Sequence, residues 1–333
     1  MTGASDGRRT RGATLRAAVL PALAATLVTA LGGCGAAAPQ AVDAPPVISR
    51  YASPNPGSVN AYLVSTSRGI VLVDAGRNNA GGRAVAQQVH DAGRPLLAVL
   101  ITHEHPDHIG GLPALHAAFP DAPIYASAQT ATLMRQNPHG LYQSAHRDDP
   151  DFPTELVYPD HLLDVGQSGD LNLGGTVFQT KQFPVGEAGS ATAYYLSATR
   201  DLFTGDLTAD HVTPALIEGA TCGWLGDLVA LQQAFPDATT ADPGHGSPSP
   251  ATDQEAQTRT YLVRVRSLVA DAVARSSPGG SDVTRAEQRI VLTALARQFP
   301  RYPRVAALPT LAQANVAAVA AEISAEPART RCG

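Results

Sequence analysis

The stretch best suited to chemistry is the run His-Glu-His-Pro-Asp-His at residues 103–108. His103, His105 and Asp107 alternate, so an extended chain would point all three side chains the same way. His108 would join them as the chain turns. Imidazole and carboxylate groups are ligands for Zn, Fe, Mn and Co, so the run indicates a site for two divalent metal ions. A solvated polar turn is the weaker alternative.

An apolar segment leads directly into this cluster. Leu96–Ile101 has the length and composition of a buried strand, which would hold the ligand-type side chains at one fixed point. In the same extended segment Glu104 would point to the other side, so we do not expect it to be a ligand.

Strands and helices alternate along most of the chain, which predicts an α/β protein with two αβ halves sharing one site. Before the cluster we expect strands at 60–64 and 69–73, a helix at 81–92 and the strand at 96–101. After it we expect helices at 112–119, 129–135 and 225–235, and strands at 123–126, 161–165, 176–183, 191–197, 201–204 and 239–242. The remainder from residue 252 is predicted to be helical. A proline-rich loop at 137–159 is expected beside the active site, as a lid.

The composition of the 333 residues limits the function classes. A hydrophobic content of 44% is enough for one large domain or two modest ones. The formal net charge is −5 and Lys181 is the only lysine, with no arginine-rich stripe. Nucleic-acid binding is therefore not expected.

The N-terminus carries the features of an export signal. Four arginines precede an apolar stretch at 17–31, which ends in Leu-Gly-Gly before Cys34. The stretch is too short and alanine-rich for a confident membrane span. It resembles a bacterial lipoprotein signal, which implies that residues 1–33 are removed, Cys34 is lipidated and 34–46 form a flexible tether. The protein would then be exported and anchored to a membrane. An ordinary secretory signal is the alternative.

Two further cysteines are far apart in the sequence. Export would permit a disulfide between Cys222 and Cys332. Two unpaired buried thiols are equally compatible with the sequence.

The run at 103–108 resembles the signature of the metallo-β-lactamase superfamily of binuclear metallohydrolases. Three further motifs, which contain Asp74, Asp206 and His245, resemble superfamily motifs in the same order over residues 47–250. The resemblance implies a four-layer αββα fold, with residues 251–333 as a C-terminal helical extension. It also implies that Asp74 supports the site, Asp206 bridges two metals and His245 completes the second. Gly205 and Gly244 would allow close backbone approach beside the ligands.

One position departs from the superfamily pattern. Glu187 stands where the superfamily usually carries a third histidine for the first metal. Three accounts are open: Glu187 is itself the ligand beside His103 and His105, it points away and only the second site is filled, or the site is vestigial. The alkylsulfatase branch has a similar glutamate. An additional carboxylate would favour harder ions such as Mn or Fe over Zn more than an all-histidine site does.

The resemblance and the ligand set together predict a two-metal hydrolase of a small molecule. A metal-bridging hydroxide would attack an ester, lactone, sulfate ester, phosphoester or amide, and Asp107 would hold it and accept its proton. We rank a β-lactam substrate low because of Glu187. The alternative is a non-catalytic metal- or ligand-binding envelope lipoprotein on the same fold, since fold does not fix function.

Overall fold

The computed structural model describes residues 44–55, 57–164, 169–276, 283–305, 309–326 and 332. The expected signal peptide at 1–33, the lipidation residue Cys34 and most of the expected tether lie outside these residues. Within the described ranges, no helix has both the length and the apolar composition needed to cross a membrane.

Two six-stranded sheets form the centre of the described chain. The first follows chain order: β1 (Val47–Ala52), β2 (Asn60–Ser65), β3 (Ile70–Val73), β4 (Leu96–Leu100), β5 (Ile124–Ser127) and β6 (His161–Leu163). The second holds β7 (Gly169–Leu173), β8 (Thr176–Phe183), β9 (Ala191–Leu196), β10 (Asp201–Gly205), β11 (Thr240–Pro243) and β12 (Ser249–Pro250). Parallel pairing joins β3 to β4 in the first sheet and β10 to β11 in the second.

Alternating side chains fix how the two sheets pack. On β2, Tyr62 and Val64 face the second sheet and share a core with Phe178, Tyr194 and other residues of that sheet. The intervening β2 residues lie in a different core, which contains residues of the helices on the outer face. Because successive strand residues point to opposite faces, one hydrophobic strand supplies both cores.

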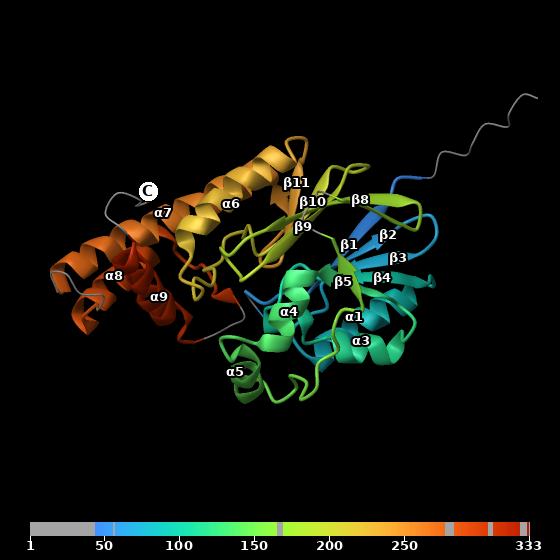
Figure 1. Ribbon diagram of the computed structural model, residues 1–333, viewed down its shortest axis with the longest axis horizontal. Coiled ribbons are helices and arrows are strands. Elements are labelled where there is room, and N and C mark those ends of the chain that lie inside the picture. Colours follow the sequence, from blue (N-terminus) through green and yellow to red (C-terminus); the bar gives the residue numbers. More distant parts are fainter. Residues whose placement is uncertain are drawn as a thin grey trace, which may run out of the picture. The chain divides into compact units, whose positions relative to one another are not determined.

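Helices cover both outer faces, which completes four αββα layers and confirms the predicted fold class (Figure 1). Helices α1 (Asn79–Asp91), α3 (Leu112–Ala118) and α4 (Ala128–Gln136) contribute to the core on the first sheet's outer face. Helix α6 (Thr221–Ala234) packs on the second sheet through Leu231, with Phe235 just beyond its end.

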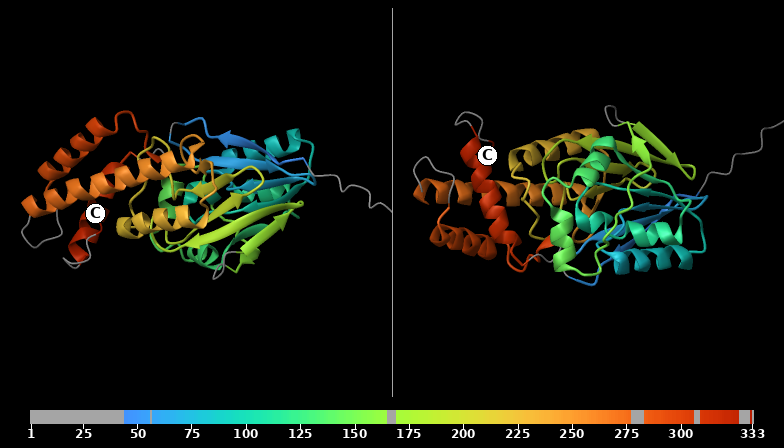
Figure 2. Two further views of the ribbon diagram at one scale, coloured as in Figure 1. Left: turned by 90° about the horizontal axis from the view of Figure 1, so that it is seen from above. Right: turned by 60° about the horizontal axis from the view of Figure 1, so that its bottom comes forward.

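The C-terminal region is helical, as expected, and shares a core with α6. It contains α7 (Ala251–Ser276), α8 (Arg285–Gln298) and α9 (Leu311–Ala325), which group beside α6 in both views of Figure 2. Trp224 of α6 is fully buried in this shared core. The opposite face of α6 packs on the second sheet, so this helix connects the C-terminal helices to the layered core.

The structure differs from the sequence expectations at several elements. Helix α5 (Leu141–Asp148) occupies part of the segment predicted to be a loop, and it is short and lies between Pro138 and Pro150. Strands β1 and β7 were not predicted because they lie at sheet edges and are largely polar or exposed. Short helix α2 (Pro106–Ile109) begins inside the ligand run, with Pro106 at its first turn.

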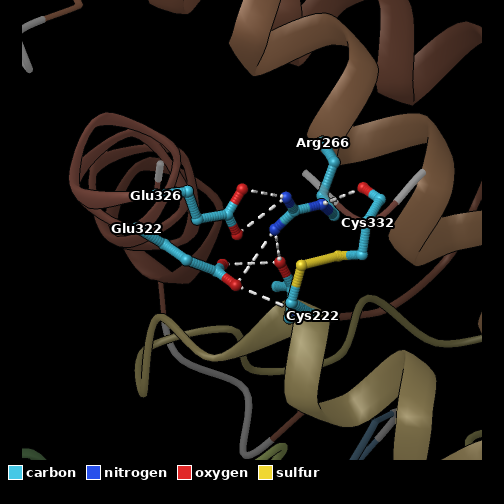
Figure 3. The surroundings of a disulfide bond; sticks show 6 residues. Cys222, Arg266, Glu322, Glu326 and Cys332 are labelled. Carbon is cyan, nitrogen blue, oxygen red and sulfur yellow. Dashed lines mark hydrogen bonds and ion pairs between the residues drawn. A yellow bond between two sulfur atoms is a disulfide. The ribbon is translucent and has the colours of Figure 1, made fainter. Parts of the chain in front are cut away.

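Cys222 and Cys332 form a disulfide, which decides between the two interpretations left open by the sequence. Beside it, the buried guanidinium of Arg266 on α7 pairs with Glu322 at 3.0 Å and with Glu326 at 2.8 Å (Figure 3). Glu322 also accepts from the backbone N–H of Cys222 at 2.9 Å. The start of α6 is thereby tied to α7, α9 and the C-terminal Cys332.

Replacing Cys222 and Cys332 together by alanine should lower the free energy of unfolding by about 2–4 kcal/mol, because the bridge restricts the unfolded chain across a long loop. Urea denaturation of the purified chain measures this difference. The matched control is Cys34→Ala, which removes the third cysteine and should leave the midpoint unchanged. Equal midpoints for the double variant and the parent would contradict the prediction.

Candidate metal centre

The ligand-type residues collect at the carboxyl ends of strands from both sheets. His103 and His105 follow β4, and α2 then provides Asp107 and His108. Asp206 follows β10 directly, His245 comes two residues after β11, and Glu187 lies in the turn between β8 and β9. Because the carboxyl ends of parallel strands meet at one edge of a sheet, these segments converge on one place.

The first group of candidate ligands contains His103, His105, Glu187 and Asp206, whose ligand atoms lie within 4.8 Å of one another. Glu187 is buried and points into this group. Its Oε1 lies 3.2 Å from His105 Nδ1, and its Oε2 lies 3.6 Å from His103 Nε2. This geometry agrees with the first of the three accounts of Glu187 and disagrees with the second, in which the side chain points away.

The second group contains Asp107, His108 and His245, with ligand atoms within the same 4.8 Å. Asp107 Oδ2 lies 3.2 Å from His245 Nε2. Because Pro106 starts a helical turn, Asp107 does not line up with the two preceding histidines as an extended chain would place it, and this part of the sequence expectation was wrong.

Asp206 lies between the two groups. Its Oδ1 is 3.3 Å from His108 Nε2, and its Oδ2 is 3.2 Å from His245 Nε2. The same side chain belongs to the first group. One carboxylate therefore faces both sets of ligand-type atoms, which is the position that a bridging ligand requires.

Asp74 orients His108 directly and His103 through Thr102. Its carboxylate lies 2.8 Å from His108 Nδ1 and accepts from the backbone N–H and the hydroxyl of Thr102. The Thr102 hydroxyl oxygen is also 2.9 Å from His103 Nδ1. Because their Nδ1 atoms are engaged in these contacts, His103 and His108 present their Nε2 atoms to the centre as the possible ligand atoms. Asp74 has a left-handed φ of 59°, an uncommon conformation for a non-glycine residue.

Two glycines leave room for the ligands, as the sequence predicted. A Cβ on Gly244 would overlap Asp206 Oδ1 and lie 2.5 Å from His108 Cε1. A Cβ on Gly205 would lie 2.7 Å from Thr102 Oγ1, and Gly205 also has a left-handed φ of 53°. Side chains at either position would therefore displace the groups that define the centre.

Several atoms at the centre are buried and lack a hydrogen-bond partner. They are His103 Nε2, His105 Nε2, His108 Nε2, both nitrogens of His245, both carboxylate oxygens of Glu187, and Asp206 Oδ1. Burying such polar atoms without partners is costly, so their convergence indicates that they are built to meet cations. The nitrogen and oxygen donors fit the ions of the middle first-row series.

The electrostatics of the centre point the same way. Burial lowers the pKa of His103 well below its usual value, and His108 and His105 lower it further. Burial also acts to lower the pKa of His108, but Asp206 and Asp74 overcome it and raise that pKa well above its usual value. Burial raises the pKa of Glu187 to about 7. Keeping Glu187 ionised at neutral pH thus requires nearby positive charge, which divalent cations would provide.

Glu104 is not a member of either group of candidate ligands. Its Oε1 accepts from the backbone N–H of Gly189 at 2.8 Å, so it holds the turn that carries Glu187. The expectation that Glu104 turns to the other side agrees with this placement.

A pocket opens onto the centre, with His105, Asp107 and Asp206 in its lining. Its cavity volume is about 90 Å³. Residues of α5 form part of its wall, so the 137–159 segment does lie beside the centre, with residues 141–148 forming a helix inside it.

Sequence reasoning missed Glu218. Its Oε1 lies 3.8 Å from His105 Nε2, and its Oε2 lies 3.0 Å from His139 Nε2. Burial acts to raise the pKa of Glu218, but interactions with His105 and His139 lower it overall. No local motif marks this residue, because it reaches the centre only through the fold of the segment between β10 and α6.

Solved structures share this architecture. A metallo-beta-lactamase family protein of Thermus thermophilus superposes with a TM-score of 0.57 at 19% identity, covering 84% of this chain and 91% of that one. The BLEG-1 B3 metallo-beta-lactamase gives a TM-score of 0.54 at 23% identity, covering 65% and 99%. At such identities the likeness establishes the fold: this is an αββα protein of the metallo-beta-lactamase type.

The sequence establishes the family. The profile of the metallo-beta-lactamase superfamily matches residues 54–275, more than half of the chain. This chain therefore belongs to the metallo-beta-lactamase superfamily.

Curated relatives match over shorter stretches. YobT of Bacillus subtilis is 32% identical over 104 residues, which are 31% of this chain and 42% of YobT. A hydroxyacylglutathione hydrolase of Thermosynechococcus vestitus is 28% identical over 155 residues, 46% of this chain and 51% of the relative. The chain thus spans about half the length of these relatives, or less.

Replacing Gly244 by alanine should weaken Zn binding by about 10- to 100-fold, because the new methyl group would displace Asp206 and His108. Isothermal titration of the metal-depleted chain with Zn measures the change. The matched control is Gly226→Ala on α6, where a Cβ meets nothing within 4 Å. If both variants bind Zn as the parent does, the assigned centre is wrong.

Proposed function

We propose that this protein is a hydrolase that depends on two divalent metal ions. The observation that carries the proposal is the convergence of two ligand groups around Asp206, at the end of an open pocket. One ion would be held by His103, His105, Glu187 and Asp206. The other would be held by Asp107, His108 and His245, with Asp206 shared. Zn is the first choice of ion; the carboxylate of Glu187 keeps Mn and Fe as alternatives.

When bound, the ions would activate a water molecule for attack and polarise the oxygen of the substrate group under attack. Asp107 lines the pocket, so it would orient the attacking water and take up its proton. Asp74 and Thr102 would keep the histidines in their orientation during the reaction. This chemistry requires no serine or cysteine nucleophile.

The proposed substrate is a small molecule with an ester, lactone, sulfate ester, phosphoester or amide bond. Hydrolysis is supported by relatives named hydroxyacylglutathione hydrolase and probable metallo-hydrolase, the latter from Streptococcus pyogenes serotype M6. The acidic balance of the chain argues against a nucleic-acid substrate.

Metal analysis combined with a panel of esters, lactones, sulfate esters, phosphodiesters and amides tests the proposal. The chain should bind close to two ions and turn over one class of compound. Asp107→Ala should lower kcat/KM for that class by about 10²- to 10⁴-fold, since it removes a group that handles the proton. Asp121→Ala, which removes an exposed carboxylate away from the pocket, is the matched control.

Two outcomes would contradict the proposal. Equal turnover by the parent chain and Asp107→Ala would exclude the role given to Asp107. A purified chain without metal, to which neither Zn nor Mn binds, would instead favour the alternative of a non-catalytic binding protein on the same fold.

We also propose that the protein is exported and held to a membrane through a lipid on Cys34. This rests on the arginine-rich start, the apolar stretch at 17–31 and the small residues before Cys34. In a bacterial expression host, Cys34→Ser should move the protein from the membrane fraction to the soluble fraction after cell disruption. Ala37→Ser, a change close to Cys34 that leaves the cysteine in place, is the matched control. A parent chain that is already soluble would contradict the anchor.

A further inference from the structure

The pocket beside the metal centre has a partly apolar lining. Three candidate ligands and the polar residues Arg77, Ser144 and Asp148 contribute to it, and six of its residues are apolar: Pro106, Leu141, Ala145, Ala215, Ile217 and Val305. They come from α2, from α5, from the segment between β10 and α6, and from the C-terminal region. An apolar surface held open beside polar groups is the usual construction of a ligand site.

Helix α5 presents one face to this pocket. Leu141, Ser144, Ala145 and Asp148 line it, and their spacing places them on a single side of the helix. On this face Leu141, Ser144 and Ala145 are half-buried and Asp148 is exposed, so part of the face is open to the pocket. The helix is held at its flanks: the Tyr142 hydroxyl donates to Glu104 O at 3.2 Å, and Asp149 accepts from Asn78 Nδ2 at 2.8 Å.

The part of the lining formed by residues 215, 217 and 305 is held by the C-terminal region. Asn315 on α9 accepts from Leu216 N at 2.8 Å and donates to Pro214 O at 2.8 Å, which clamps the backbone on both sides of Ala215. The Val305 N–H donates to Thr213 O at 3.1 Å. Ala215 and Val305 belong to one small apolar core, and Ile217 packs against it. The wall is therefore preformed.

A charged group would fit the apolar part of this lining poorly, because its desolvation would need a partner of opposite charge. Arg77, the cation of the lining, has its Nε 3.3 Å from Asp149 Oδ2. Asp148, the anion of the lining outside the ligand groups, is exposed, so solvent screens its charge. An apolar group would gain from leaving water and would cover more of the half-buried Leu141 and Ala145.

We propose that this pocket binds an uncharged, apolar substituent of the substrate, an alkyl or aryl group attached next to the bond that is cleaved. Ile217 and Leu141, which come from two different segments of the lining, would determine how well longer groups are bound. The proposal rests on the proposed function for the position of the cleaved bond. The affinity of the pocket for an apolar group can be measured without any hydrolysis.

Straight-chain hydroxamic acids from two to eight carbons are suitable probes, since the hydroxamate binds metal ions and the chain extends from it. Calorimetric titration of the Zn-loaded full chain should show affinity rising about fourfold for each methylene buried, until the pocket is filled. Ile217→Ala and Leu141→Asn should each reduce this dependence on chain length by at least half while leaving the affinity for acetohydroxamate within about twofold. Ile290→Ala, at an exposed position on α8, is the matched control and should match the parent.

If Zn does not bind, the hydroxamate series cannot be used. Calorimetric titration of the chain without added metal with 1-alkanols of increasing length then tests the apolar pocket by itself. Their affinity should also rise with chain length and fall in Ile217→Ala. Affinities that do not depend on chain length in either series, or that respond equally to Ile217→Ala and Ile290→Ala, would overturn the inference. Chain-length dependence without turnover of any compound in the panel would leave this inference standing and count against the proposed hydrolase.

Discussion

Charge compensation at one buried point is the constraint on which the rest of the structure depends. The carboxylates of Asp107, Asp206 and Glu187 are buried within about 4 Å of imidazole nitrogens, and burial alone would make each of them difficult to ionise. Metal ions can offset such charge only if the ligand atoms are held in a fixed arrangement. The remainder of the fold can be understood as the means of holding them.

The scaffold achieves this by ending strands of two packed sheets at the same place. The shared core between the sheets fixes the strand ends, and Asp74 and Thr102 then orient two histidines through their outward nitrogens. Gly244 and Gly205 let backbone approach the ligands where a side chain would collide. The C-terminal helices likewise hold the pocket in shape, because Asn315 hydrogen-bonds the backbone of the segment that forms one of its walls.

Most elements that contribute buried apolar residues could be predicted from the sequence. β4 is a continuous apolar run, and the strand and helix order around it follows from such patterns. The edge strands β1 and β7 are largely exposed, so their sequences carry little signal, and the short helix α5 lies in a proline-rich segment. Pro106 did carry a signal for the start of α2, since proline is favoured in a first helical turn.

The sequence by itself determined the superfamily resemblance, the αββα class and the seven candidate ligands. These residues can be recognised without the structure because they occur in short local motifs at the ends of strands. Only the tertiary structure decided that Glu187 turns inward and that Cys222 pairs with Cys332. It alone brought Glu218 to the centre and Val305 to the pocket. These facts depend on contacts between segments far apart in the chain, and no local pattern of residue types encodes such distances.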